Sequence, residues 1–235
     1  VVGWRAGDDA IEIAGEALHC VNALEFENDD RLLVSDGSSN YNPGRWCHDL
    51  MERGHTGRVG AWNFRTKTSE LLARGQHYAF GVLSLNGGLI YSESWRHRIV
   101  CAGKGSGDVF LADLPGYPSR MCPSGDDGLW LTCFVCRTQL VEFVLREDAY
   151  RKRMLAEIDP RYWIVPALSS GHSFLEPLQG AGVKQMGVHK PWAPPRSYGL
   201  ILRIDKNGRT IASLHSQVDG CNHGVTAVAE LGGAL

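Results

Sequence analysis

The stretch Val82-Leu-Ser-Leu-Asn-Gly-Gly-Leu-Ile-Tyr-Ser92 decides the class of fold. Two short apolar runs flank the turn Asn86-Gly87-Gly88, and glycine-rich turns of this kind suit a tight hairpin because they tolerate positive φ angles. Apolar runs this short, bounded by turn residues, are typical of strands rather than helices. The stretch therefore predicts an antiparallel β-hairpin.

The same pattern recurs along the chain. Strand-like runs occupy residues 21–26, 32–35, 57–62 and 70–73, and again 82–84, 89–92, 98–101 and 109–112. A four-stranded unit that recurs at about 40 to 58 residues is typical of propeller blades. The alternative is a β-sandwich, which would not require the repeat. We predict an all-β propeller built of four-stranded blades.

The blade count indicates an incomplete propeller. Residues 1–5 and 11–14 supply half a blade, two full blades follow, and a third begins near Pro118. That blade is interrupted and resumes at 198–205 and 210–215, and a fourth starts at Gly224. Propellers close with about 4 to 8 blades, because closure removes exposed strand edges. We therefore predict one propeller domain over residues 1–235, incomplete at both ends and interior to a longer protein.

The interruption at residues 137–196 differs in character from the blades. Apolar residues fall near helical spacing through 139–156, and six of the ten prolines follow within the interruption. This pattern predicts a helical and loop insertion within one blade. Long insertions between strands are often lids or binding loops. A structural cover for exposed strand edges is the alternative.

Composition excludes several classes of function. The chain has 24 Lys and Arg against 26 Asp and Glu, so no basic excess indicates nucleic-acid binding. No apolar run reaches the roughly 18 residues of a transmembrane segment. Seven cysteines, an odd number, indicate mostly free thiols and a reducing compartment such as the cytoplasm.

Three stretches carry a resemblance to a known family. They are Leu33-Val-Ser-Asp-Gly-Ser-Ser-Asn-Tyr41, Tyr91-Ser-Glu-Ser-Trp-Arg-His-Arg98 and Asp113-Leu-Pro-Gly-Tyr-Pro118. The chain resembles the strictosidine synthase-like proteins, grouped with the senescence-marker-protein, gluconolactonase and luciferin-regenerating-enzyme proteins. The resemblance implies a six-bladed β-propeller with the insertion over its channel mouth. It also implies a lactone- or ester-hydrolysing activity, with Ca²⁺ held by inward-pointing oxygen ligands.

The corresponding positions of this chain match the family ligands in part. The resemblance assigns Asn22 as a metal ligand, because its amide supplies an oxygen of the kind that Ca²⁺ prefers. Phe80 and Ser119 stand where the family commonly has an asparagine and an aspartate. An aromatic ring cannot ligate a cation, and Arg120 adds a positive charge beside Ser119. We therefore expect Phe80, Ser119 and Arg120 to bind substrate, with Arg120 anchoring an anionic or carbonyl-bearing small molecule.

Two histidines are the candidate catalytic residues. His19 and His223 precede expected first strands of blades, and a histidine near neutral pH can act as a general base. Hydrogen bonding to loop backbone is the alternative role. Two functions remain open: a lactone or ester hydrolase with a divergent metal and catalytic set, or a propeller that has lost catalysis and binds a small molecule or a protein. Substrate identity and oligomeric state do not follow from the sequence.

Overall fold

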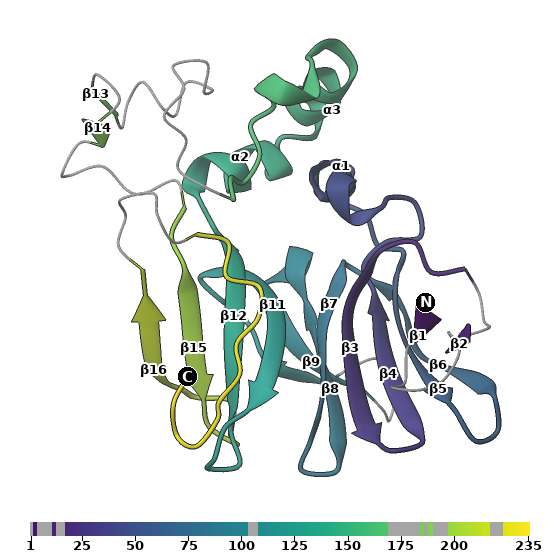
Figure 1. The fold of residues 1–235 in the computed structure, drawn as a ribbon. Coiled ribbons are helices and arrows are strands. Elements are labelled where there is room, and N and C mark those ends of the chain that lie inside the picture. Colours follow the sequence, from purple (N-terminus) through teal and green to yellow (C-terminus); the bar gives the residue numbers. More distant parts are fainter. Residues whose placement is uncertain are drawn as a thin grey trace. The chain divides into compact units, whose positions relative to one another are not determined.

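Strands dominate the computed structural model of the protein (Figure 1). It describes residues 2–3, 11–12, 17–102, 108–168, 184–185, 188–189, 197–216 and 223–235. The chain divides into two compact units, the first being Val1–Leu50 with Gly54–Asp113 and the second Met51–Arg53 with Leu114–Leu235. No helix in the described part of the chain is long and apolar enough to cross a membrane.

The first unit contains two four-stranded antiparallel sheets. One sheet consists of β3 (Val21–Asn28), β4 (Arg31–Asp36), β5 (Gly57–Asn63) and β6 (Thr68–Gln76) in that order. The other consists of β7 (Ala79–Leu85), β8 (Gly88–Glu93), β9 (Arg98–Ala102) and β10 (Val109–Leu111). Each strand pairs with the next one along the chain, as in a propeller blade and unlike the Greek-key order of a sandwich.

The two sheets pack against each other through alternate residues. Their shared core holds mostly small and medium apolar side chains together with one tyrosine, namely Ala23, Leu33, Val59, Ala61, Ala79, Val82, Tyr91 and Val100. On the other face of the first sheet, Leu32, Val34 and Trp62 form a separate cluster. The period of two along each strand divides the apolar residues between these two faces.

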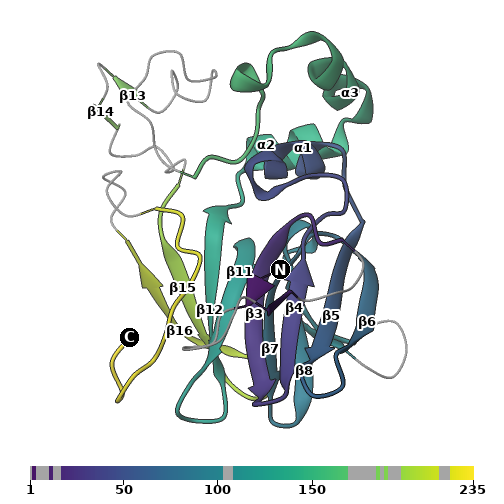
Figure 2. The same ribbon diagram turned by 45° about the vertical axis from the view of Figure 1, so that its right-hand side comes forward.

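Short helices lie between the strands of the first unit. The turn η1 (Pro43–Arg45) and α1 (Trp46–Met51) connect β4 to β5, and η2 (Ser94–Arg96) connects β8 to β9. Figure 2 shows α1 beyond the ends of β4 and β5. The loop that carries α1 therefore lies at the end of the sheet where β3 begins.

The second unit contains one four-stranded antiparallel sheet. Its order is β11 (Gly116–Pro123), β12 (Leu129–Cys136), β15 (Leu200–Ile204) and β16 (Thr210–His215). All eight residues of β12 are buried, whereas all six of β16 are exposed. Burial therefore falls from the first two strands to the fourth, as it also does towards β6 in the first unit.

The chain between β12 and β15 contains α2 (Gln139–Arg146), α3 (Asp148–Glu157) and η3 (Pro160–Tyr162), then β13 (Lys184–Gln185) and β14 (Val188–His189). The expected helical stretch over 139–156 is divided in two at Glu147, whose backbone is not helical. The Thr138 hydroxyl caps α2 by accepting a hydrogen bond from the Val141 amide. The expected insertion also includes residues 169–183, 186–187 and 190–196, which lie outside the described part.

The all-β class and the four-stranded antiparallel sheets are confirmed. The strand expected from Gly224 is absent, because residues 223–230 form no strand and only Leu231 and Ala234 pair, as an isolated bridge. At the other end, β1 (Val2–Gly3) and β2 (Ile11–Glu12) form a two-stranded pair. The count of six blades and the single domain over residues 1–235 stay predictions.

Candidate functional site

The first strand of each four-stranded sheet departs from regular pairing in its first half. In β3 the register shifts around Asn22, in β7 it shifts across Phe80, and in β11 it shifts across Ser119. Bulges of this kind re-aim a side chain and are frequent beside active sites. The three residues therefore lie at equivalent irregularities in three successive sheets.

Asn22 links the two sheets of the first unit. Its side chain is buried, and Nδ2 donates a 2.9 Å hydrogen bond to the carbonyl oxygen of Ala79 at the start of β7. Its Oδ1 meets the thiol of Cys20 at 3.8 Å. Gly37 makes room for the amide, since a Cβ at that position would clash with Nδ2. The Asn22 side-chain amide therefore joins the two sheets by a hydrogen bond.

Phe80 belongs to an aromatic cluster at the same end of the first unit. Its ring centroid lies 6.2 Å from that of Tyr78, which stacks on Trp95 at 4.1 Å. The Tyr78 hydroxyl contacts Cys20 Sγ at 3.3 Å, and burial raises the pKa of both groups. The thiol and the phenol are therefore neutral near pH 7, and Phe80 contributes an apolar surface.

Ser119 and Arg120 bond to the segment that follows His223. Ser119 Oγ lies 3.0 Å from the carbonyl oxygen of Thr132 and 3.3 Å from that of Val225, and both oxygens are possible acceptors of its one hydroxyl proton. The backbone N and Nη1 of Arg120 both lie 3.4 Å from the carbonyl oxygen of Thr226. Desolvation lowers the pKa of the Arg120 guanidinium below its usual value, and the group stays charged near neutral pH.

The two candidate histidines differ in their surroundings. His19 is exposed in the segment that leads into β3. Both ring nitrogens of His223 are buried, and neither has a hydrogen-bond partner among the residues that the structure describes. Gly224, which follows, has a φ of +62°, a conformation that favours glycine.

The candidates form two groups. Asn22 and Phe80 lie at the same end of the paired sheets in the first unit, joined through the carbonyl oxygen of Ala79 and the β7 backbone. In the second unit, Ser119 and Arg120 hold the backbone directly after His223. His19 is a surface residue and joins neither group through the contacts above.

The side chains at these positions offer few oxygen donors for Ca²⁺. A calcium ion takes 6 to 8 oxygen ligands. The Asn22 oxygen meets a thiol, Phe80 offers no donor atom, and the Ser119 hydroxyl points at backbone carbonyls. No group of three His, Cys, Asp or Glu side chains suited to a metal gathers within the described residues. These donors do not fit a calcium cage.

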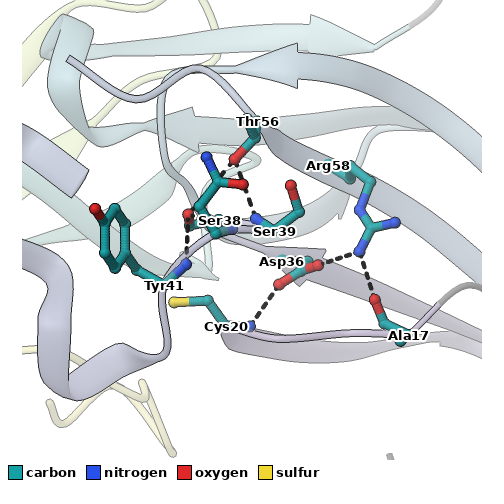
Figure 3. A network of polar contacts seen from close by, with 9 residues as sticks. Ala17, Cys20, Asp36, Ser38, Ser39, Tyr41, Thr56 and Arg58 are labelled. Atoms are coloured by element: carbon teal, nitrogen blue, oxygen red, sulfur yellow. Dashed lines mark hydrogen bonds and ion pairs between the residues drawn. The ribbon is translucent and has the colours of Figure 1, made fainter. Parts of the chain in front are cut away.

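A buried ion pair at this end of the first unit was not predicted from the sequence (Figure 3). Asp36 is 1% exposed, and its Oδ1 accepts a 2.7 Å hydrogen bond from the Cys20 amide. Its Oδ2 pairs with Arg58 Nη2 at 2.5 Å, and the same nitrogen donates to the carbonyl oxygen of Ala17 at 2.8 Å. The only sequence signal is an acidic residue at the end of an apolar strand.

Asp49 is a second buried acid that sequence reasoning did not single out as functional. Its carboxylate accepts 2.6 Å hydrogen bonds from Ser38 Oγ and from Trp95 Nε1. A Cβ at position 54 would clash with this carboxylate, so Gly54 makes room for it. Asp49 thereby ties the loop of α1 to Trp95 and so to the aromatic cluster.

Comparison with known proteins gives strictosidine synthase-like proteins and adipocyte plasma membrane-associated proteins as relatives. No family model matches the chain. Strictosidine synthase-like 13 of Arabidopsis thaliana is 27% identical over 214 residues, covering 88% of this chain and 47% of that protein. The adipocyte plasma membrane-associated protein of Salmo salar is 24% identical over 201 residues, covering 79% of this chain and 47% of that protein. The predicted resemblance to strictosidine synthase-like proteins is confirmed.

The chain spans about half the length of these curated relatives. Among solved structures, one described as a gluconolactonase matches with a TM-score of 0.41 and 17% identity, over 56% of this chain and 49% of that one. A luciferin-regenerating enzyme matches with a TM-score of 0.37 and 15% identity, over 49% and 39% of the two chains. These structural scores are too low to support an argument about the site.

Proposed function

We propose that this chain, a relative of the strictosidine synthase-like proteins, is part of a hydrolase that acts on a lactone or ester of a small molecule. His223 is the general base, and Arg120 binds the carbonyl oxygen or an anionic group of the substrate. Ser119 completes the binding surface in this proposal, and the role of Phe80 in substrate binding stays a prediction from the sequence. The activity is proposed for the whole protein. This chain matches about half the length of its curated relatives.

The state of His223 is the observation that carries the proposal. A buried imidazole normally has hydrogen-bond partners, because leaving a buried polar group unpaired costs about 1–3 kcal/mol. Both ring nitrogens of His223 lack partners among the described residues. The backbone two and three residues further on is bonded to Ser119 and Arg120, which keeps the segment of His223 beside β11. A base without a partner among the described residues, in a segment whose backbone bonds to Arg120, is an arrangement suited to acyl transfer.

The chemistry needs only these groups and water. His223 takes a proton from water as the water oxygen bonds to the carbonyl carbon of the substrate. The negative charge that develops on the carbonyl oxygen is stabilised by the Arg120 guanidinium. The acyl C–O bond then breaks, and the proton held by His223 passes to the leaving oxygen. The products are a carboxylic acid and an alcohol, which for a lactone remain in one molecule.

Calcium remains a cofactor implied by the resemblance, but the donors at Asn22, Phe80 and Ser119 do not fit it. A calorimetric titration of the full-length protein with CaCl₂ tests the point. Tight binding that is lost in Asn22→Ala would make Asn22 a ligand after all. Asn22→Ala would otherwise affect only stability, because the amide joins the two sheets.

A binding protein without catalysis is the second candidate. The contacts of Asn22 and Ser119 favour it. Their polar atoms bond to backbone carbonyls, although a metal-dependent hydrolase would need metal ligands at these positions. In that case Arg120 would hold an anionic ligand and His223 would not affect turnover. Binding of a hydroxy acid or lactone without any hydrolysis would support this candidate.

A panel of lactones and aryl esters, assayed with the full-length protein, tests the proposed activity. Arg120→Gln should lower kcat/KM at least about tenfold, and Arg120→Lys should recover part of it, because charge stabilises the oxyanion. Arg209→Gln is the control, because Arg209 is an exposed arginine of the same unit. Absence of turnover by the wild-type protein across the panel would overturn the proposal.

The cellular compartment is also a proposal. The six cysteines within the described residues are all free. Cys221 lies outside the described part of the chain. Free thiols favour a reducing compartment such as the cytoplasm.

A further inference from the structure

Each of the three bulges has a buried hydroxyl side chain on the neighbouring second strand of its sheet. Ser35, Ser92 and Thr132 lie on the second strands β4, β8 and β12, and each is 0% exposed. They follow Asn22, Phe80 and Ser119 by about the same number of residues. Each hydroxyl interrupts a run of apolar or fully buried side chains, where a hydroxyl needs a partner to offset its desolvation.

In the first unit the hydroxyls bond to backbone groups that the bulges release. Ser35 Oγ accepts a 3.0 Å hydrogen bond from the Ala23 amide and donates to the carbonyl oxygen of Phe80. Ser92 Oγ accepts a 2.7 Å hydrogen bond from the Gly81 amide. Both amides directly follow a residue at a bulge, Asn22 in β3 and Phe80 in β7.

In the second unit the hydroxyl of Thr132 bonds to the backbone of Arg120, the proposed anion-binding residue. Thr132 Oγ1 donates a 2.9 Å hydrogen bond to the carbonyl oxygen of Arg120 and lies 2.7 Å from Ser119 Oγ. Ser119 Oγ in turn contacts the carbonyl oxygen of Val225. A chain of three groups therefore runs from β12 through the bulge to the segment of His223.

The recurrence has a physical reason. A bulge removes one pair of groups from the regular ladder, and a buried amide or carbonyl without a partner is costly. A hydroxyl both donates and accepts, so it can replace either missing group at a place that the neighbouring strand backbone no longer reaches. The bulge is then held in one conformation, and so is the direction of the side chain that it carries.

We propose that Ser35, Ser92 and Thr132 are positioning residues that hold these bulges, and that Thr132 thereby aims Arg120 at the substrate. The part that concerns Arg120 rests on the proposed function. The part that concerns the bulges is independent of it, because amide exchange measures the hydrogen bond whether or not the protein is an enzyme.

The experiment uses three variants of the full-length protein. Thr132→Val removes the hydroxyl at nearly constant volume, Thr132→Ser restores it, and Thr210→Val makes the same change at an exposed position of β16. The measurements are kcat and KM for the ester that the wild type hydrolyses fastest in the panel above. We expect Thr132→Val to lower kcat/KM about tenfold or more, Thr132→Ser to restore it, and Thr210→Val to leave it unchanged.

Amide hydrogen exchange in Ser35→Ala and Ser92→Ala provides the second readout. We expect the Ala23 amide to exchange about tenfold faster in the first variant and the Gly81 amide in the second, each without a change at the other site. Equal exchange at both sites in wild type and variants would overturn the positioning role. If no ester is hydrolysed, the proposed function fails and the exchange data alone decide the role of the hydroxyls. If esters are hydrolysed but Thr132→Val behaves as wild type, the role of Thr132 fails and the proposed function stands.

Discussion

At the scale of single residues, two buried acids of the first unit bind several neighbouring groups, which their positions in the sequence do not indicate. Asp36 and Asp49 are each 1% exposed. Sequence patterns place a polar residue at a strand end or in a helix, but they do not reveal which neighbours meet its carboxylate. Those neighbours are distant along the chain, as Trp95 is from Asp49, so only the packed fold brings them together.

Removal of the Asp49 carboxylate should destabilise the protein. In Asp49→Ala the Ser38 hydroxyl and the Trp95 indole N–H lose their common acceptor while staying largely buried, which should cost about 3 kcal/mol. Asp49→Asn keeps one acceptor oxygen and should cost less. Urea unfolding followed by tryptophan fluorescence measures both. Asp29→Ala, at an exposed turn, is the control, and an equal effect in the two alanine variants would contradict the role of Asp49.

His77 should make stability depend on pH. Its pKa is lowered from 6.5 by burial and by Arg96, against the opposing effect of Glu93, with smaller contributions from His55 and Arg98. The folded state then binds a proton less readily than the unfolded state does. The contribution of neutral His77 to the unfolding free energy is complete above about pH 6.5. It is lost as the pH falls through the pKa that His77 has in the folded state.

His77→Gln tests this dependence. The variant should lose part of the decrease in unfolding free energy between pH 7 and pH 5, measured by urea titration at each pH. His215→Gln, at an exposed histidine of β16, should keep the wild-type slope. A slope that is the same in wild type and His77→Gln would show that His77 does not contribute.

At the scale of elements, the hairpins were predictable because their turns are encoded locally. The turn between β7 and β8 has positive φ angles at Asn86 (52°) and Gly87 (77°), as the Asn-Gly sequence predicts for a two-residue hairpin. The bulges were not predictable, because no turn residue marks them. The hydroxyls of Ser35, Ser92 and Thr132 were the available signal, but it is readable only once the strands are aligned.

The two glycines of that hairpin provide a matched comparison. Gly87 has a φ of +77° and no atom near its added Cβ, so Gly87→Ala should cost about 1 kcal/mol through backbone strain alone. Gly88 lies outside the positive-φ region, and its added Cβ would make an ordinary contact at 3.6 Å, so Gly88→Ala should change stability by less than about 0.5 kcal/mol. Thermal unfolding of both variants measures the difference. A larger loss in Gly88→Ala would contradict the assigned turn.

At the scale of the whole molecule, the repeat of four strands was the strongest signal in the sequence. It predicted the class of fold and the division of the strands into four-stranded units. It did not predict the break at Glu147 or the lack of a strand after Gly224, because these depend on tertiary contacts rather than on periodicity. The candidate residues Asn22, Phe80 and Ser119 were placed by resemblance to the family, whereas the lack of a partner for His223 among the described residues could be read only from the structure.

The turnover number of His223→Gln on the fastest-hydrolysed ester or lactone tests the central claim most directly. Glutamine keeps a polar side chain but cannot accept the proton, so kcat should fall about 10²- to 10⁴-fold while the unfolding free energy stays close to that of the wild type. His215→Gln should retain wild-type turnover. A His223→Gln protein that is folded and turns over at the wild-type rate would contradict the assignment of His223 as the general base.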